Sequence, residues 1–221
     1  ELAELIQFQV GDAASLELYE ASLALYEALQ DERGVAIASA YFLITQERLQ
    51  AARLFDASLS RAQALQDNWL IASAYLRMGF SALWFDEVEA GAGYLEQGLS
   101  FARRAGDRWT IGGALTNLGE VARIRREYDR AAAYYREALT IQRELDDRHD
   151  AAVTLQNLGC IASQQGAYAQ ARALFLDSLH LYQSLGRKRG LCDCLAGFGG
   201  LAVEQGQLDR AVRLLAAAQT H

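Results

Sequence analysis

Similar residues recur every 40 positions along most of this 221-residue chain. The most regular series are one of glycine, one of leucine and one of aspartate: Gly79, Gly119, Gly159 and Gly199; Leu59, Leu99, Leu139 and Leu179; Asp67, Asp107 and Asp147. Earlier in the chain the step is 36 residues, as from Asp31 to Asp67. A fixed period of this length is typical of proteins built from stacked copies of one small unit. The repeat therefore restricts the fold more than any other feature of the sequence.

Each unit contains two segments with the apolar spacing of an amphipathic helix. In one unit the two stripes consist of Leu115, Leu118 and Ala122, then of Ala131, Tyr135 and Ala138. Polar residues separate the two segments, at 125–127 in this unit and at 164–166 in the next. Such a break indicates a short turn between antiparallel helices. The sequence therefore predicts a helix, a turn, a helix and a turn in every unit.

The ends of the units carry helix stop and start signals. Gly106 and Gly186 suit the left-handed conformation that often ends a helix. Asp107 and Asp147 follow at positions where a carboxylate can accept hydrogen bonds from the first N–H groups of the next helix. We expect these residues to mark the boundaries between units.

The order Leu115-x-x-Leu118-Gly119-x-x-Ala122, followed by Ala131-x-x-x-Tyr135 and Ala138, resembles the tetratricopeptide repeat (TPR) motif. Ala51-x-x-x-Phe55 and Ala171-x-x-x-Phe175 match its second helix in other units. The resemblance implies an all-α fold, a right-handed superhelical solenoid of antiparallel helix pairs with about twelve helices. It covers the chain as a single repeat domain of about six units: 1–30, 31–66, 67–106, 107–146, 147–186 and 187–221.

The repeated residues also predict how the helices pack. Gly119 and Ala131 are expected to face each other where the two helices of a pair cross closely. A series of large apolar residues is expected to fill the gap to the next unit: Phe55, Leu95, Tyr135, Phe175 and Leu215. The second unit lacks four residues between its helices, near Leu43. We expect its hairpin to be shorter and more open.

Composition narrows the classes of partner. The net charge is −7, with ten acidic and three basic residues in 1–60 but three acidic and five basic residues in 181–221. Direct binding of nucleic acid needs clustered excess Lys and Arg, so we expect none. The sequence contains neither an apolar run long enough to span a bilayer nor a secretion signal. We expect a cytoplasmic protein, and the first and last residues suggest a piece cut from a longer chain.

No residue pattern in the sequence predicts catalysis, a metal or a cofactor. Cys192 and Cys194 lie two residues apart on a predicted helix and have no histidine at ligand spacing, and His149 lies in a predicted turn. Gly197-x-Gly199-x-x-Ala202 fits the spacing of a dinucleotide fingerprint, but Gly199 belongs to the glycine series inside a helix. We interpret these residues as structural.

One column of residues suggests a binding groove. Tyr41, Arg77, Asn117, Asn157 and Gly197 each occupy the position two before the glycine position of their unit. The resemblance places this position on the concave face, where TPR proteins use Asn to hold the backbone of an extended peptide. An amide both donates and accepts hydrogen bonds and can therefore pair with any peptide group. The alternative is that the two Asn are ordinary polar residues of an exposed face.

Aromatic residues suggest a second candidate surface. Trp84 lies close to Phe80 and Phe85 at the end of a predicted helix, and these three side chains are candidates to line a groove. Trp69 and Trp109 recur one repeat apart, each just after an Asp, where the ring can pack over the start of a helix. We interpret this second pair as structural.

Three functions are compatible with these features. The first is a non-catalytic scaffold that binds a protein or peptide in a groove. By resemblance to the C-terminal TPR arrays of bacterial multidomain ATPase and transcriptional regulators, it would be the sensing or protein-contact arm of such a regulator. The second is a free-standing peptide-binding adaptor or peptide receptor, and the third is a small-molecule sensor. The sequence leaves the oligomeric state open, including self-association through exposed end units.

Overall fold

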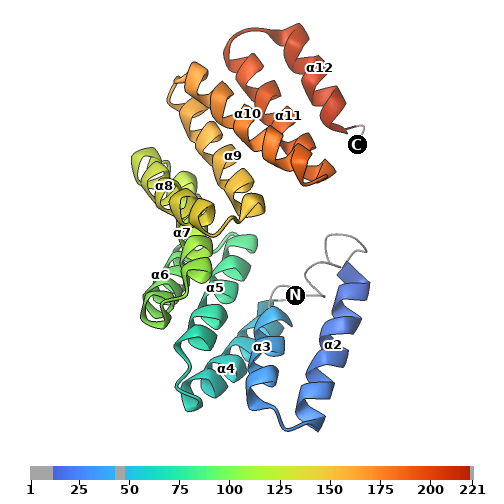
Figure 1. Cartoon of the computed structure of the whole chain (residues 1–221), viewed down its shortest axis with the longest axis vertical. Coiled ribbons are helices and arrows are strands. Elements are labelled where there is room, and N and C mark those ends of the chain that lie inside the picture. The colour runs from blue at the N-terminus through green and yellow to red at the C-terminus, as the bar shows by residue number, and fades with distance from the viewer. Residues whose placement is uncertain (1–11, 43–47, 220–221) are drawn as a thin grey trace. The chain divides into compact units, whose positions relative to one another are not determined.

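The structure is a computed structural model that describes residues 12–42 and 48–219 (Figure 1). The side chains of residues 12–16, 19, 40–42, 48–51 and 219 lie outside this description. The described residues form eleven α-helices and no strand: α2 (Asp12–Ala28), α3 (Glu32–Phe42), α4 (Arg48–Ala64), α5 (Asn68–Trp84), α6 (Val88–Ala105), α7 (Arg108–Ile124), α8 (Tyr128–Glu144), α9 (Arg148–Gln164), α10 (Tyr168–Ser184), α11 (Lys188–Glu204) and α12 (Leu208–Gln219). The predicted all-α class is confirmed.

The period of 40 residues consists of two similar halves of 20. From α5 onward, each new helix starts 20 residues after the last. Each turn that the structure describes, which leaves out the α3–α4 connection, holds one residue in the left-handed conformation: Gln30, Gln66, Asp86, Gly106, Arg126, Asp146, Gly166, Gly186 and Gly206. These nine turns close in the same way, as where the Glu87 N–H donates to the Ala82 carbonyl at 2.8 Å. The left-handed conformation predicted for Gly106 and Gly186 is confirmed.

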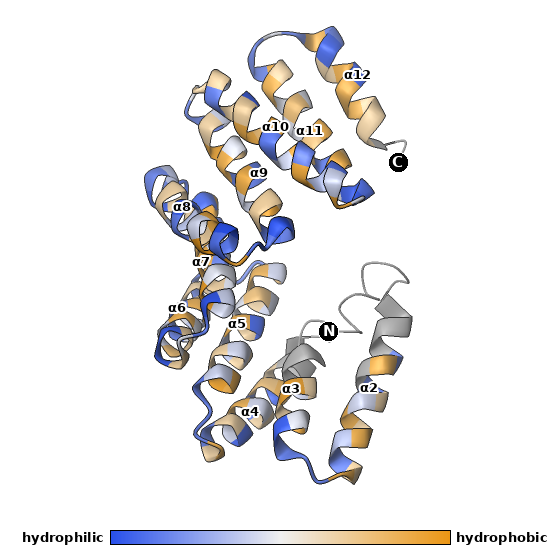
Figure 2. Ribbon diagram, in the orientation of Figure 1, coloured by the Kyte–Doolittle hydropathy of each residue, from blue (hydrophilic) through white to orange (hydrophobic). Residues whose placement is uncertain are grey.

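The chain divides into two compact units between Asn117 and Leu118. In the first unit, consecutive helices pack against each other from α2 to α6. In the second, they pack in sequence from α8 to α12, and α11 also contacts α9. Figure 2 shows hydrophilic residues gathered at many of the turns and hydrophobic residues distributed along the helices. This consecutive packing of helices is the arrangement that the repeat predicts.

The glycine series provides space for the series of large apolar side chains. A Cβ added to Gly119 would lie 2.6 Å from the Tyr135 ring, and one added to Gly159 would lie 2.7 Å from the Phe175 ring. Gly79 and Gly199 face Leu95 and Leu215 in the same way. A large side chain of the second helix therefore fills the place of the missing side chain on the first.

This packing corrects two details of the sequence prediction. The atoms nearest to Gly119 belong to Tyr135 rather than to Ala131. The large side chains also do more than fill the gap to the next unit, because Phe175 packs on Gly159 of its own helix pair as well as on Gly197 of the next. Close facing of two small residues does occur in the first unit. There, a Cβ on Gly79 would lie 3.2 Å from the Gly91 carbonyl oxygen.

The described part of α3 has 11 residues, against 17 in α5, α9 and α11. The helix that follows, α4, begins 16 residues after α3 begins, whereas the corresponding interval is 20 residues in each later pair. The four missing residues therefore fall before α4. Leu43 and the rest of 43–47 lie outside the described residues, so the more open hairpin stays a prediction.

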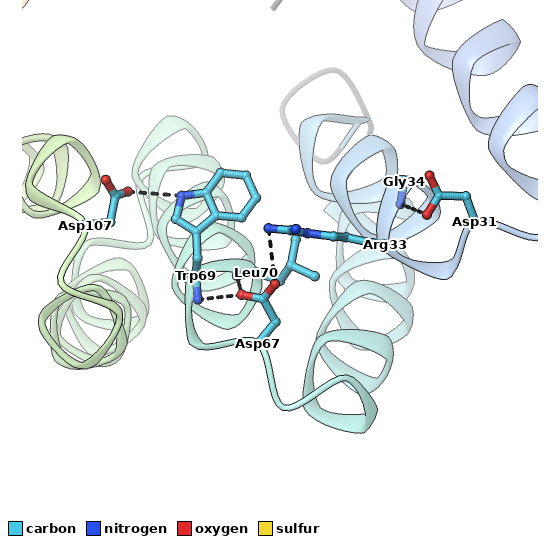
Figure 3. Close-up of polar contacts among 7 residues, drawn as sticks. All are labelled: Asp31, Arg33, Gly34, Asp67, Trp69, Leu70 and Asp107. Atoms are coloured by element: carbon cyan, nitrogen blue, oxygen red, sulfur yellow. Dashed lines mark hydrogen bonds and ion pairs between the residues drawn. The ribbon is translucent and has the colours of Figure 1, made fainter.

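Capping aspartates also connect neighbouring helix pairs (Figure 3). The Asp67 carboxylate accepts hydrogen bonds from the N–H groups of Trp69, at 3.0 Å, and Leu70, at 3.2 Å, and it lies 3.4 Å from the Arg33 guanidinium. The Trp69 indole N–H donates to Asp107 at 3.0 Å, and the same carboxylate caps α7. Arg33 and Trp69 each stand two residues after a capping Asp. The structural role expected of Trp69 is therefore found in its contact with Asp107.

Candidate functional site

The predicted groove column falls on the first helices of successive pairs. Arg77 on α5 and Asn117 on α7 are half-buried in the first unit. Asn157 on α9 and Gly197 on α11 are half-buried in the second unit. The side chain of Tyr41 lies outside the described residues. Asn157 and Gly197 thus lie on α9 and α11, two first helices that contact each other, and their role in binding stays a prediction.

The predicted aromatic surface lies at the end of α5. Trp84 is 78% exposed, and Phe80 and Phe85 are exposed as well. Phe80 and Trp84 are four residues apart and so share one face of the helix. They lie outside the linings of the two clefts described below. Their part in binding a ligand stays a prediction.

The second unit contains a cleft of about 720 Å³. It lies between α7, α9 and α11, which are the first helices of three successive pairs. One side chain from α8 and one from α10 complete its lining. Its lining consists of Arg123, Ile124, Arg126, Tyr128, Cys160, Ser163, Gln164, Phe175, Ala196, Gly197, Gly200, Leu201 and Glu204. Apolar residues are joined in this lining by hydroxyl, amide and charged groups, which is the mixed character of many ligand sites.

Small residues on α11 leave this cleft open. Ala196, Gly197 and Gly200 stand one repeat after Gln156, Asn157 and Cys160 of α9, which are larger. Gly197 is required by packing, because a Cβ there would lie 2.8 Å from the Phe175 ring.

Gly200 differs from Gly197 in its surroundings. A Cβ added to Gly200 would have no atom within 4 Å. A glycine inside a helix costs about 1 kcal/mol relative to alanine, and packing of the chain gives no reason for one at this position. Its effect is to leave the wall of the cleft without a side chain.

A two-point ion pair holds Arg123 at the other wall of the cleft. The Nε of Arg123 donates to Glu120 Oε2 at 2.8 Å, and Nη2 donates to Oε1 at 2.5 Å. The hydroxyl of the buried Tyr135 donates to Glu120 Oε2 at 3.2 Å. Both charged side chains are about one third exposed, at 35% and 34%. Arg123 is therefore half-buried and fixed in place by Glu120.

Burial and this ion pair shift several pKa values in opposite directions. Burial raises the pKa of Glu120, but the hydrogen bonds and charge of Arg123 outweigh it, and the net pKa is below the ordinary value of 4.5. Burial raises the pKa of the Cys160 thiol, which the charge of Arg123 partly offsets. Burial also raises the pKa of Tyr135. At neutral pH the cleft is thus lined by the neutral thiol of Cys160 and by the guanidinium of Arg123, which is paired with Glu120.

We expect Arg123→Ala to lower the free energy of unfolding by about 1–2 kcal/mol near neutral pH, because it leaves a partly buried carboxylate without its guanidinium. The pKa of Glu120 is lower in the folded chain than in the unfolded chain, so its ionisation stabilises the fold above pH 4.5 and this contribution fades at lower pH. The loss should therefore shrink in acid. Urea unfolding of both proteins above and below pH 4.5 measures it.

The control is Arg136→Ala, at an exposed arginine on the neighbouring α8. Its expected effect is below about 0.5 kcal/mol at either pH. A loss for Arg123→Ala that is equally small, or that does not depend on pH, would show that the ion pair contributes nothing to the fold.

The sequence prediction missed most of the cleft, although Gly197 of the predicted column lines it. On α7 and α9 the lining begins only after the Asn residues of the column. The missed positions also follow the repeat: Cys160 and Gly200 line the cleft and continue the series of Glu120, and Ile124, Gln164 and Glu204 form another series. The decrease in side-chain size from Glu120 through Cys160 to Gly200 could have indicated an opening on α11. The sequence did not show which of these positions packs against side chains of other helices and which faces open space.

A second, smaller cleft of about 390 Å³ lies between α8, the start of α9 and α10. Most of its lining is charged or polar, including Arg143, Asp146, Arg148, Asp177 and His180. No group of three or more His, Cys, Asp or Glu among the described residues is arranged to hold a metal ion. None of the described helices combines the length and apolarity that a membrane span requires.

Comparison with known proteins supports the repeat assignment. Residues 110–184 match the family model of the tetratricopeptide repeat. No curated protein matches the sequence. Among solved structures, BtubC (BKLC) from P. vanneervenii is similar with a TM-score of 0.78 at 19% identity, over 92% of this chain and 88% of that one.

Two further structures share the fold. A Rap protein complexed with competence and sporulation factor has a TM-score of 0.77 at 15% identity, over 97% of this chain and 62% of that one. The TPR-like repeats of a kinesin light chain from Podosopora anserina have a TM-score of 0.62 at 12% identity, over 87% and 93%. The chain thus spans less than two thirds of the Rap protein. It has a TPR-like fold, and residues 110–184 carry the recognisable repeat.

Proposed function

We propose that this chain is a non-catalytic scaffold that binds an extended segment of a protein or peptide in the 720 Å³ cleft of its second unit. The observation that carries the proposal is the open wall at Gly200, opposite the fixed Arg123. Most helix positions carry a side chain, and Gly200 carries none. The missing side chain gives a ligand backbone room to approach the helix closely.

The lining suits an extended peptide. The exposed Ile124 offers apolar surface to a ligand side chain, and Ser163 and Gln164 offer a hydroxyl and an amide to its backbone. The Tyr128 hydroxyl donates to the Gln164 side-chain oxygen, which orients this amide. Asn157 stands one turn before Cys160 on α9, and we propose that it extends the same surface. Asn117 and Arg77 would serve the corresponding face of the first unit.

We place the scaffold in the cytoplasm, as the sensing or protein-contact arm of a bacterial transcriptional or signalling regulator. The support for this context is the likeness of the repeats to those of such regulators. The similarity of fold to a Rap protein complexed with competence and sporulation factor supports peptide binding as the kind of interaction. Direct contact with nucleic acid is not part of the proposal, because the net charge is −7.

The test is a selection of displayed random peptides on the purified chain, followed by affinity measurements on the peptides obtained. Gly200→Trp places a large ring in the cleft at a position where no atom lies within 4 Å. It should weaken binding by about tenfold or more. Gly93→Trp is the matched control, since Gly93 is exposed on α6 and also has open space around it. It should leave the affinity unchanged.

The paired replacement of Asn117 and Asn157 by Ala tests the groove column separately. Loss of two hydrogen bonds should weaken binding by about 1–3 kcal/mol and leave folding nearly unchanged. Selected peptides that bind the Gly200→Trp variant as tightly as the wild type would rule out the cleft as the binding site. A selection that enriches no peptide would contradict the proposal itself.

A further inference from the structure

The charged residues of the 720 Å³ cleft come from the first and the last of its three first helices. Arg123 lines it from the last turn of α7 and Arg126 from the turn that follows, whereas Glu204 lines it from the end of α11. Every other lining residue is uncharged, including those of α9, the first helix between these two in the chain: Cys160, Ser163 and Gln164. The cleft therefore has a basic wall, a neutral middle and an acidic wall.

Arg126 is the basic group that this cleft offers to a ligand. Arg123 is already held by Glu120 through two hydrogen bonds. Arg126 is exposed, and its side chain forms no hydrogen bond or ion pair with any described residue. Its backbone is left-handed, and Gly166 and Gly206 occupy the same position in the next two pairs. Glycine adopts this conformation with less strain, so the turn itself gives no reason for an arginine.

Glu204 is also unfavourable for its local structure. It is the last residue of α11, it is exposed, and among the residues that the structure describes it has no ion-pair partner. A negative charge at the C-terminus of a helix is unfavourable, because the carbonyl groups there are themselves partly negative. The equivalent residues of α7 and α9 are the neutral Ile124 and Gln164. The helix therefore does not account for a carboxylate at this position.

Three residues thus depart from local preference, and all three line one cleft: Arg126, Gly200 and Glu204. Natural sequences tend to break local rules where function requires it. Gly200 leaves space for a peptide backbone, and the other two place opposite charges on separate helices. These departures have a common explanation if the cleft binds a segment that carries both signs of charge.

The separation of the two charges sets the length of that segment. Packed helices lie about 10 Å apart, so two steps from α7 through α9 to α11 span about 20 Å. An extended chain covers about 3.3 Å per residue, and about six residues therefore reach from one wall to the other. Arg126 and Glu204 are too far apart at this spacing to pair with each other. Each is left for an opposite charge on the ligand.

We infer that the cleft selects an extended segment with an acidic and a basic side chain about six residues apart, the acid bound by Arg126 and the base by Glu204. The inference rests on the proposed function and adds the class of peptide. A guanidinium holds a carboxylate through two parallel hydrogen bonds. A segment with two like charges would place one of them against a like charge on the protein, which weakens binding.

Reversal of each charge tests the inference on peptides selected against the wild type. The peptides are synthesised with acetylated N-termini and amidated C-termini, so that only side chains carry charge. They should bind Arg126→Glu about tenfold more weakly, and exchange of their acidic residue for lysine should restore the affinity. Glu204→Arg should respond in the same way to exchange of the basic residue for glutamate. Arg136→Glu, at an exposed arginine outside the lining, should leave the affinity unchanged.

The restored affinity separates charge recognition from damage to the fold, because a misfolded variant would bind neither form of the peptide. Peptides that bind both reversed variants as tightly as the wild type, that lose binding on capping alone, or that are not restored by the exchange would overturn the inference. If such peptides still bind Gly200→Trp weakly, the cleft is the binding site and only its charge selectivity is wrong. Peptides that bind Gly200→Trp as tightly as the wild type would contradict the proposed function, and the inference with it.

Discussion

Phe175→Ala is expected to lower the free energy of unfolding by about 3–5 kcal/mol. The ring is almost fully buried and packs on Gly159 of its own pair and on Gly197 of the next. It also meets Phe198 edge to face, with ring centroids 5.5 Å apart. In a repeat protein, stability depends on such contacts between neighbouring pairs. Urea unfolding followed by circular dichroism measures the loss.

The matched control is Leu215→Ala, one repeat later in the same series. Leu215 packs on Gly199, but it is exposed because no described helix covers its other side. The expected loss is about 1 kcal/mol. Similar losses at the two positions would show that burial between successive pairs adds little, and the account of Phe175 would be wrong.

Gly119→Leu is expected to lower the free energy of unfolding by about 2–4 kcal/mol through overpacking. Even the first added carbon would lie 2.6 Å from the Tyr135 ring, so the ring or the helix must move. Tyr135 also donates a hydrogen bond to Glu120, and a displaced ring would break it. Gly119→Ala should show a smaller loss in the same direction.

Gly113 on the same helix provides the control, because a Cβ there would have no atom within 4 Å. Gly113→Ala should raise stability by about 0.5–1 kcal/mol, the usual gain when alanine replaces glycine in a helix. If both glycines respond alike to alanine, the glycine series does not serve packing.

Local features of the sequence were enough to predict the helices and most of their ends. The apolar stripes depend on the helical period. Asp107 caps a helix through the N–H of Thr110, and Asp147 does so through the N–H of Asp150. These interactions join residues a few positions apart, so residue type and spacing reveal them. Arg126, however, occupies the left-handed position that glycine holds elsewhere, and its residue type gave no sign of that.

The sequence by itself determined the all-α class and the repeat, because a period repeats the same local chemistry in every unit. The pairing of Gly119 with Tyr135 emerged only from the packed helices, since the sequence pattern had placed Ala131 there. The candidate site was decided by tertiary contacts. Glu120 and Arg123 are close in sequence, but only the buried Tyr135 makes their pair part of the core. Gly197 and Gly200 look alike in the sequence. Only the folded structure places Phe175 against the first and open space beside the second, because those surroundings come from helices far away in the chain.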